Sequence, residues 1–293
     1  MDYFYEFCGV RFRVEAERPM WTEPQADQFL ISPAVPDVRI HTVCCPELPE
    51  AEGVRLGSRG EQTVWRSGDT ITRYAQDPFR KQPHLRTSYA LSAVQDVQCA
   101  ALEPDWRWAT RSQFFWPGIS LPQLLLHFRT LVFHASYAGC GGGAVLFSAP
   151  SRTGKSTQAA LWERHRGAKV LNGDKAAVRL DGPAIVHGLP VCGTSGICKN
   201  VSLPLRCVVL LSQAPENSIR RLRLTEALPL LSRNLFADTL VSEEWQLALS
   251  LLLDLLAEVP VYALACTPDV RAVETLEAAM ARDGLISDHG RRL

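Results

Sequence analysis

Apolar and polar residues alternate along much of the first hundred positions. The segments YFYEFCGVRFRV at 3–14 and VRIHTVCC at 38–45 follow the two-residue period of half-buried strands. In TVWRSGDTITRY at 63–74, two such runs flank a Ser-Gly-Asp turn, which predicts a β-hairpin. Helical periodicity is weak throughout this part of the chain. Residues 1–112 are therefore predicted to form a mainly antiparallel β module.

The pattern changes after a connecting segment at 106–118. SLPQLLLHFRTLVFHAS at 120–136 predicts a buried helix, with Ser120 as its candidate N-cap. Short apolar strands and helical patterns then alternate, which predicts an α/β domain over residues 113–293. The expected strands lie at 143–149, 168–174, 207–213 and 260–266, the expected hairpin at 176–188, and the expected helices at 155–167, 225–236, 242–259 and 268–284.

Composition and charge narrow the classes of partner. The formal net charge is zero, so the chain has no overall basic field of the kind that supports nucleic-acid or membrane binding. The longest apolar run, at 247–259, is interrupted by Asp254 and is too short to span a bilayer. The first twenty residues do not resemble a secretory signal. We therefore expect neither a nucleic-acid nor a membrane partner.

Cysteine usage bears on the compartment. The chain has nine cysteines, an odd number, and they are scattered without a CxxC pair. This distribution is typical of reduced thiols in a cytosol. A cytoplasmic protein is therefore expected.

A lysine-containing loop is the clearest chemical signal. Only five of the 31 basic residues are lysines, and one of them, Lys155, follows Gly154 between a predicted strand and a predicted helix. The order of strand, APSRTGKST and helix matches a nucleotide phosphate loop, in which backbone N–H groups surround a phosphate, the lysine reaches the β and γ oxygens, and Ser156 ligates Mg²⁺. The expected nucleotide-binding residues are Ala149, Ser151, Arg152, Thr153, Gly154, Lys155, Ser156 and Thr157, with Lys199 as a candidate second phosphate contact.

The loop departs from its consensus at the first position. The pattern G-x-x-x-x-G-K-[ST] begins with glycine, whereas this chain has Ala149. If that position requires a positive φ, alanine costs roughly 1 kcal/mol. The alternative interpretation is a serine-rich loop that caps an ordinary helix.

Several segments together resemble the HPr kinase/phosphorylase family, and more closely its shorter bacterial relatives found beside modified-peptide gene clusters. The similar segments are LVFHASYA, GAVLFSAPSRTGKST, GAKVLNGDKAAVRL, HGLP and CKNVSLPLRCVVLL. The resemblance covers about residues 120–280 and none of the N-terminal module. It implies an ATP- and Mg²⁺-dependent kinase that phosphorylates a serine, or a threonine, of a peptide or protein.

The resemblance also implies roles for individual residues. Lys155 would contact the nucleotide phosphates, Ser156 and Asp174 would hold the metal, and His134 would end the helix before the loop. Lys155, Asp174 and His134 are thus the candidate catalytic residues. Where the family has two adjacent acids, this chain has Gly173 and Asp174, so Asp174 either holds Mg²⁺ or orients the acceptor hydroxyl. From the residues alone, Asp174 could equally be a turn acid, His134 a core histidine, and Lys199 a surface lysine.

Other functions stay open at this point. One is a small-molecule kinase or a phosphate-loop hydrolase. Another is a nucleotide-responsive binding protein, in which Ala149 and the missing second acid weaken catalysis. The N-terminal module carries no candidate catalytic residues and is expected to present the acceptor segment. The long C-terminal helices offer surfaces for a homo-oligomer.

Overall fold

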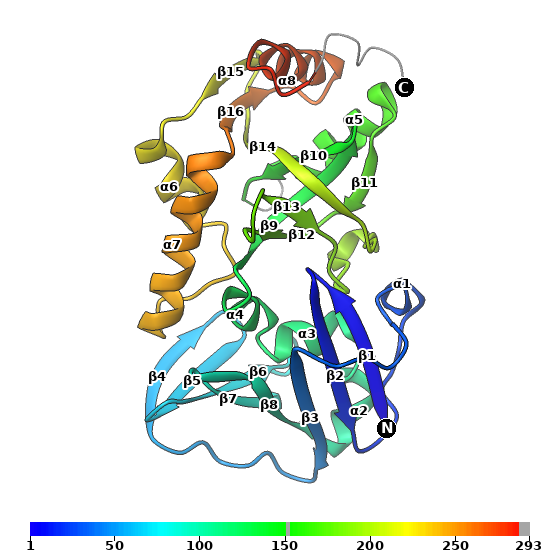
Figure 1. Cartoon of the computed structure of the whole chain (residues 1–293), viewed down its shortest axis with the longest axis vertical. Helices are drawn as coiled ribbons and strands as arrows, with labels where there is room; N and C mark the ends of the chain where they lie inside the picture. Colours follow the sequence, from blue (N-terminus) through cyan, green and yellow to red (C-terminus); the bar gives the residue numbers. More distant parts are fainter. Residues whose placement is uncertain (151–152, 287–293) are drawn as a thin grey trace. The chain divides into compact units, whose positions relative to one another are not determined.

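The structure, a computed structural model, describes residues 1–150 and 153–286. It is mixed α/β with two large β-sheets, and the chain divides into two compact units (Figure 1). Unit 1 comprises Met1–Phe128 and Ala237–Leu247, and unit 2 comprises Arg129–Phe236 and Ala248–Leu293. Within the described part of the chain, no helix combines the length and the apolar character needed to cross a membrane.

The described residues of unit 1 form an eight-stranded sheet in the order β1-β2-β3-β8-β7-β6-β5-β4. In this sheet β3 pairs in parallel with β2 and β8, and the other pairings are antiparallel, as the alternating pattern predicts. The predicted hairpin is confirmed, because β5 and β6 pair directly around Gly68. The strands are β1 (Asp2–Phe7), β2 (Val10–Ala16), β3 (Val38–Cys45), β4 (Val54–Arg59), β5 (Gln62–Ser67), β6 (Thr70–Gln76), β7 (Pro83–Ala90) and β8 (Ala93–Leu102).

The helices of unit 1 are short and complete its core. They are α1 (Pro24–Asp27), the 3-10 turn η1 (Glu103–Asp105), α2 (Trp106–Ala109), α3 (Ser112–Gly118) and α4 (Leu121–Leu126). Trp116 of α3 is buried against the rings of Tyr5, Phe7 and Phe12, with centroid distances of 5.1, 5.1 and 5.4 Å. This aromatic cluster makes α3 part of unit 1.

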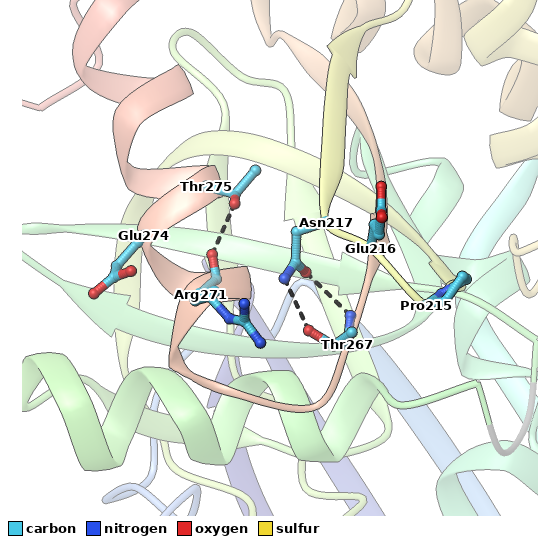
Figure 2. Close-up of a pocket in the computed structure, with 7 residues that line it drawn as sticks. All are labelled: Pro215, Glu216, Asn217, Thr267, Arg271, Glu274 and Thr275. Atoms are coloured by element: carbon cyan, nitrogen blue, oxygen red, sulfur yellow. Dashed lines mark hydrogen bonds between the residues drawn. The ribbon is translucent and has the colours of Figure 1, made fainter.

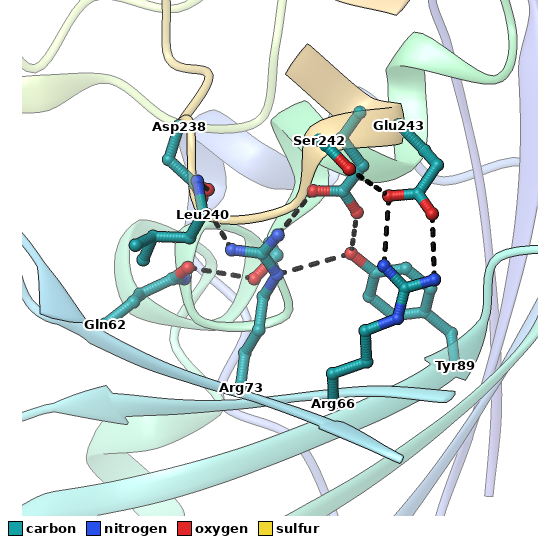
Figure 3. A network of polar contacts seen from close by, with 10 residues as sticks. Gln62, Arg66, Arg73, Tyr89, Asp238, Leu240, Ser242 and Glu243 are labelled. Atoms are coloured by element: carbon teal, nitrogen blue, oxygen red, sulfur yellow. Dashed lines mark hydrogen bonds and ion pairs between the residues drawn. The ribbon is translucent and has the colours of Figure 1, made fainter. Parts of the chain in front are cut away.

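A later segment of the chain also belongs to unit 1, where buried charges hold it (Figure 3). The fully buried guanidinium of Arg73, on β6, donates to Asp238 Oδ2 at 2.7 Å and to Glu244 Oε2. Tyr89, on β7, accepts from Arg73 Nε at 3.3 Å and donates to Glu244 Oε1. Each polar group in this cluster therefore has a partner.

The compact units of the structure differ in two respects from a division between residues 112 and 113. Residues 113–128 stay with unit 1, because the ring of Trp116 packs into its core. Residues 237–247 return to unit 1 because Arg73 binds Asp238 and Glu244. Neither contact has a signal in the local sequence pattern.

Unit 2 contains the second sheet, in which two long strands each pair more than once. β9 pairs with β12 through its first half and with β10 through its second half, and β14 pairs in turn with β13, β10 and β16. The described strands are β9 (Thr130–Cys140), β10 (Gly143–Ser148), β11 (Lys169–Asn172), β12 (Lys175–Arg179), β13 (Ile185–His187), β14 (Ser202–Gln213), β15 (Ser218–Arg221) and β16 (Val261–Cys266). β10, β14 and β16 are mutually parallel neighbours.

Helices pack against this sheet around an apolar core that includes Val145, Phe147, Trp162 and Leu276. Arg166 of α5 and Glu277 of α8 form an ion pair at 2.7 Å. The helical elements are α5 (Lys155–Arg166), the 3-10 turn η2 (Gly193–Ser195), α6 (Leu224–Ser232), α7 (Ser242–Glu258) and α8 (Val270–Arg282), of which α7 begins in unit 1 and ends in unit 2.

The expected helix at 120–136 is the main error in the predicted secondary structure. The observed helix, α4, ends at Leu126. Arg129 then has a φ of 53°, and the chain enters β9 at Thr130. Apolar runs such as LVFHAS fit a buried strand as well as a buried helix, so periodicity alone does not separate the two. Ser120 occupies the N-cap position of α4, as expected, but its side chain makes no capping hydrogen bond. It has a φ of 62°, and its hydroxyl donates to Gln62 Oε1 at 3.1 Å.

Candidate active site

The lysine loop lies where the sequence predicts it, between β10 and α5. Ala149 is buried in the core cluster and does not have a positive φ, so alanine at this position causes no backbone strain. Gly154 has a φ of 108°, a conformation that favours glycine. Ser156 and Thr157 are exposed on the first turn of α5, and Thr153 donates its N–H to Pro150 O at 3.3 Å. Ser151 and Arg152 lie outside the described residues.

The side chain of Lys155 folds back over this loop. Its Nζ donates to the carbonyl oxygens of Ala149 at 2.8 Å and Pro150 at 3.2 Å, and the residue is buried. Burial lowers the pKa of Lys155, while the charge of Asp174 acts in the opposite direction. The ammonium thus has only neutral oxygens as hydrogen-bond partners among the described residues, and a phosphate would offer it an anion.

Strand topology brings His134 and Asp174 to this loop. His134 is on β9 at the point where that strand changes partner: it faces Lys175 of β12, and the next residue, Ala135, faces Ser148 at the end of β10. The Ala135 N–H donates to Asp174 O at 3.0 Å. His134 therefore lies within a strand, and the expectation that it ends a helix is wrong. From this strand position, His134 lies near enough to the loop for the charge of Lys155 to lower the pKa of the histidine.

Asp174 is held in a turn by Asn172. The buried Asn172 side chain accepts the N–H groups of Asp174 at 2.9 Å and Lys175 at 3.0 Å, and it donates to Val191 O at 3.0 Å. This is an Asx-type turn. Asp174 is thus a turn acid and also a member of the charged cluster beside the loop.

A tight loop backs the Asp174 carboxylate. Gly193 approaches so closely that a side chain at that position would collide with Asp174, and the backbone of Gly193 has a φ of 59°. The loop is closed by a disulfide between Cys192 and Cys198, whose Cα atoms are 4.8 Å apart. The scattered cysteines predict reduced thiols, whereas the structure pairs these two. The chain turns through Gly193 and Gly196, which brings two cysteines six positions apart face to face.

Lys175 and Phe236 complete the cluster. Lys175 Nζ forms an ion pair with Asp174 Oδ2 and lies 5.0 Å from the centroid of the Phe236 ring. The His134 ring stacks on the same phenyl ring, with a centroid distance of 5.9 Å and an interplanar angle of 26°. The side chains of Lys175 and Asp174 are 15% and 24% exposed, so a ligand can still reach them.

Three residues of this cluster, Asn172, Lys175 and Phe236, are not among the site residues predicted from the sequence. Asn172 belongs to a recognisable Asn-Gly-Asp turn signal, and its buried amide could have been anticipated from that signal. Lys175 stands beside the candidate acid, which makes an ion pair plausible in sequence but does not require one. Phe236 follows α6 more than sixty residues later, and no local pattern marks its contact with Lys175.

The charges of the cluster act on one another. Burial lowers the pKa of His134, and the cations Lys155 and Lys175 lower it further, against the effect of Asp174. Burial tends to raise the pKa of Asp174, but Lys175, His134 and Lys155 lower it overall. At neutral pH the cluster therefore combines a neutral histidine with an ionised carboxylate.

Lys199 stands apart from this cluster. Its residue is exposed, and its backbone N–H donates to Leu171 O at 2.9 Å. Among the described residues, the structure shows no contact between its ammonium and Lys155 or Asp174. The second phosphate contact expected at Lys199 therefore stays a prediction.

The donor set fits a magnesium nucleotide better than a metal bound by protein alone. Among the described residues, no group of three or more His, Cys, Asp or Glu side chains could hold a metal ion. Mg²⁺ in nucleotide sites usually takes one or two protein ligands and completes its shell with phosphate oxygens and water. The Ser156 hydroxyl and the Asp174 carboxylate could supply such a pair of ligands.

Comparison with known proteins adds little to this geometry. The sequence matches no family model and no curated protein. Among solved structures, the HPr(Ser) kinase/phosphatase from Coxiella burnetii is similar over 52% of this chain and 95% of its own, with 12% sequence identity and a TM-score of 0.28. A TM-score this low does not establish a common fold or function.

Proposed function

We propose that this chain is an ATP- and Mg²⁺-dependent phosphotransferase that acts on a serine or threonine hydroxyl of a peptide or protein. The observation that carries the proposal is the change of partner along β9, which brings His134 and Asp174 to the loop that holds Lys155. Phosphoryl transfer requires charge neutralisation and alignment more than covalent chemistry, and these three groups can supply both.

Each residue has a defined task in this proposal. The N–H groups at the start of α5 and the Lys155 ammonium bind the nucleotide phosphates, while Ser156 and Asp174 hold the cation. Mg²⁺, when bound, neutralises charge on the β- and γ-phosphates. The acceptor hydroxyl oxygen bonds to the γ-phosphorus, the bond from that phosphorus to the bridging oxygen of ADP breaks, and the neutral His134 ring takes the hydroxyl proton.

Lys175 adds a second cation to the cluster. Its ammonium pairs with Asp174, so a metal ion must compete with it for that carboxylate. Once displaced, its ammonium would be free to approach an oxygen of the transferring phosphoryl group. Lys175 thus sets both the affinity for the cation and the charge available during transfer.

The acceptor is proposed to be a peptide segment, which unit 1 presents. The support is that the loop, Asp174 and His134 all belong to unit 2, and that the edge strand β4 of unit 1 is largely exposed. An exposed edge strand can pair with an extended peptide through its backbone. Photo-cross-linking of a labelled acceptor should therefore map to unit 1.

Label transfer from ATP tests the proposed function. The full-length protein is incubated with Mg²⁺, ATP labelled at the γ-phosphate, and a library of serine- and threonine-containing peptides. Label on a peptide hydroxyl supports the proposal. Label on a metabolite indicates a small-molecule kinase, free phosphate indicates a hydrolase, and binding without transfer indicates a nucleotide-responsive binding protein.

A loop variant tests the nucleotide site separately. ATP at 100 times its Kd should stabilise the wild-type protein by about 2.7 kcal/mol, and Lys155→Ala should lose most of this effect. Lys169→Ala, at an exposed lysine on β11, is the matched control and should keep it. An undiminished ATP effect in Lys155→Ala contradicts the assignment of the loop.

A further inference from the structure

A cavity opens at the edge of the unit 2 sheet where the parallel strands end. β10, β14 and β16 are parallel neighbours in that order, so their carboxyl ends share one edge of the sheet. The lysine loop follows β10. The chain segments that follow β14 and β16 line a cavity of about 560 Å³, which Figure 2 shows with Pro215, Asn217, Thr267 and Arg271 among its walls. Ligands of open α/β sheets bind outside the carboxyl ends of such strands.

The floor of this cavity is fixed by paired hydrogen bonds. Asn217 Nδ2 donates to the Thr267 hydroxyl at 2.8 Å, and the Thr267 N–H donates to Asn217 Oδ1 at 3.0 Å. The Ala214 N–H donates to Cys266 O at 3.2 Å just before. These hydrogen bonds join the segments after β14 and β16 into one surface. The surface is therefore formed before a ligand binds.

The cavity is tied to the lysine loop through Gln158. This residue is 2% exposed and lies on α5, three positions after Lys155. Its Nε2 donates to Cys266 Sγ at 3.2 Å and to Thr267 O at 3.5 Å. β10 ends at Ser148, level with Ala263, and β16 continues three residues further to Cys266. With strands about 4.8 Å apart and a rise of about 3.3 Å per residue, the two strand ends are roughly 14 Å apart. A nucleotide with its phosphates on the loop can therefore extend its nucleoside into the cavity.

The charges in the cavity select the kind of ligand. Arg271 is 75% exposed, and its nearest charged partner, Asp269, is 3.5 Å away. Figure 2 shows the Arg271 guanidinium directed toward Asn217 and Thr267. A guanidinium is planar and stacks on aromatic rings. The walls also carry Glu216 and Glu274, which give the cavity a formal excess of one negative charge over Arg271. Such a cavity disfavours a polyphosphate, whereas its carboxylates can accept hydrogen bonds from sugar hydroxyls.

We propose that this cavity binds the base and ribose of the nucleoside triphosphate whose phosphates lie on the lysine loop, with Arg271 stacked on the base. The proposal rests on the proposed function, because it takes the loop as the phosphate site. It adds a second part to the nucleotide site, two strands away from Lys155.

Calorimetric titration with two ligands tests this subsite. Inorganic tripolyphosphate carries the phosphates alone, and a non-hydrolysable ATP analogue carries the nucleoside as well. The wild-type protein should bind the analogue more tightly than tripolyphosphate. Arg271→Ala should weaken binding of the analogue by about tenfold, the scale of a lost cation–π contact, and leave tripolyphosphate binding unchanged. Arg282→Ala, at an exposed arginine at the other end of α8, is the control and should change neither affinity.

The outcomes separate failure of the subsite from failure of the loop assignment. If the wild-type protein binds the analogue and tripolyphosphate equally well, or if Arg271→Ala leaves analogue binding unchanged, the subsite is wrong and the loop assignment stands. If Arg271→Ala weakens both ligands equally, the cavity does not act on the nucleoside, and the subsite is again wrong. If the wild-type protein binds neither ligand, the loop assignment fails together with the subsite.

Discussion

The two units each contain a buried cluster of charged side chains, and the clusters differ in how completely they are satisfied. In unit 1, Arg73 is fully buried and is surrounded by Asp238, Glu244 and Tyr89. In unit 2, Lys155 has loop carbonyls as its described hydrogen-bond partners, while Asp174 is partly exposed beside Lys175. In the first cluster every charged group is paired within the protein. In the second cluster, charged groups can still bind a ligand.

This difference indicates different roles for buried charge. Burial lowers the pKa of Arg73, but Tyr89, Glu244 and Asp238 raise it overall, so the guanidinium is permanently charged and permanently partnered. Such a network fixes the position of residues 237–247 on the unit 1 sheet. In unit 2 the pKa of Lys155 is lowered because burial dominates. An incompletely satisfied cation is expected where an anionic ligand binds.

The largest effect on folding should follow removal of the closed network's cation. Arg73→Met leaves Asp238 and Glu244 buried without their cation, and should lower the free energy of unfolding by about 3–5 kcal/mol. Urea denaturation of the full-length protein measures this change. Arg66→Met is the matched control, because Arg66 pairs with Glu243 at 2.8 Å near the surface, and such pairs contribute at most about 1 kcal/mol. Equal losses in the two variants would contradict the role of Arg73.

Removal of the acid from the open cluster should affect catalysis more than folding. Asp174→Asn keeps the shape of the side chain and loses its charge, and we expect the rate of phosphoryl transfer to fall about 100-fold. Because His134 is neutral and can take the proton, we expect Asp174 to act mainly on the metal. The affinity for Mg·ATP should then fall in parallel with the rate, as steady-state and binding measurements can show.

Two other results would change this assignment. If Asp174→Asn keeps its Mg·ATP affinity while the rate falls, Asp174 orients the acceptor hydroxyl. If the variant is fully active, Asp174 has no part in the mechanism.

A smaller effect is expected from Lys175, with opposite signs in two measurements. Lys175→Met removes the cation that competes for Asp174, so the Mg²⁺ concentration at half-maximal activity should decrease. The same change removes the ammonium that would stabilise negative charge on the transferring phosphoryl group. The rate should therefore fall roughly tenfold, equivalent to about 1.4 kcal/mol. Lys169→Met is the control. A rate loss with an unchanged Mg²⁺ requirement would show that Lys175 does not restrain Asp174.

Local features of the fold and the site could be predicted from the sequence, and contacts between distant segments could not. The β5–β6 hairpin, β10, the loop and α5 follow from turn chemistry and from a period confined to about ten residues. β9 could not be distinguished from a helix, because its apolar run fits both. The pairing of Arg73 with Asp238 joins residues 165 positions apart, and only tertiary packing determines it.

The candidate site follows the same division. Lys155, Gly154 and Asp174 are marked by local motifs, and in the structure Asp174 lies near enough to Lys155 for its charge to raise the pKa of the lysine. The stacking of His134 on Phe236 and the position of Lys175 over the same ring depend on the segment after α6, which pairs with β9 through the Phe236 N–H and Val132 O at 2.8 Å. The sequence pattern predicts a helix over 225–236, which includes this segment. In the structure α6 ends at Ser232, so the segment is not helical.

The smallest expected effect concerns pH and His134. Its pKa is lowered by burial and by the two neighbouring lysines, so the folded protein binds this proton less readily than the unfolded chain does. The histidine therefore contributes stability that is present above the ordinary histidine pKa, about 6.5, and is lost as the pH falls through the lower value of the folded state. Protonation would also add a third cation beside Lys155 and Lys175 and remove the proton acceptor, so the transfer rate should be nearly constant from about pH 6.5 to 8 and decline below that range. His134→Gln should have a lower rate without this acid decline, and both can be measured from rates across pH at saturating Mg·ATP. If the variant keeps the wild-type rate and pH profile and only unfolds more easily, His134 is a core residue and a different group takes the proton.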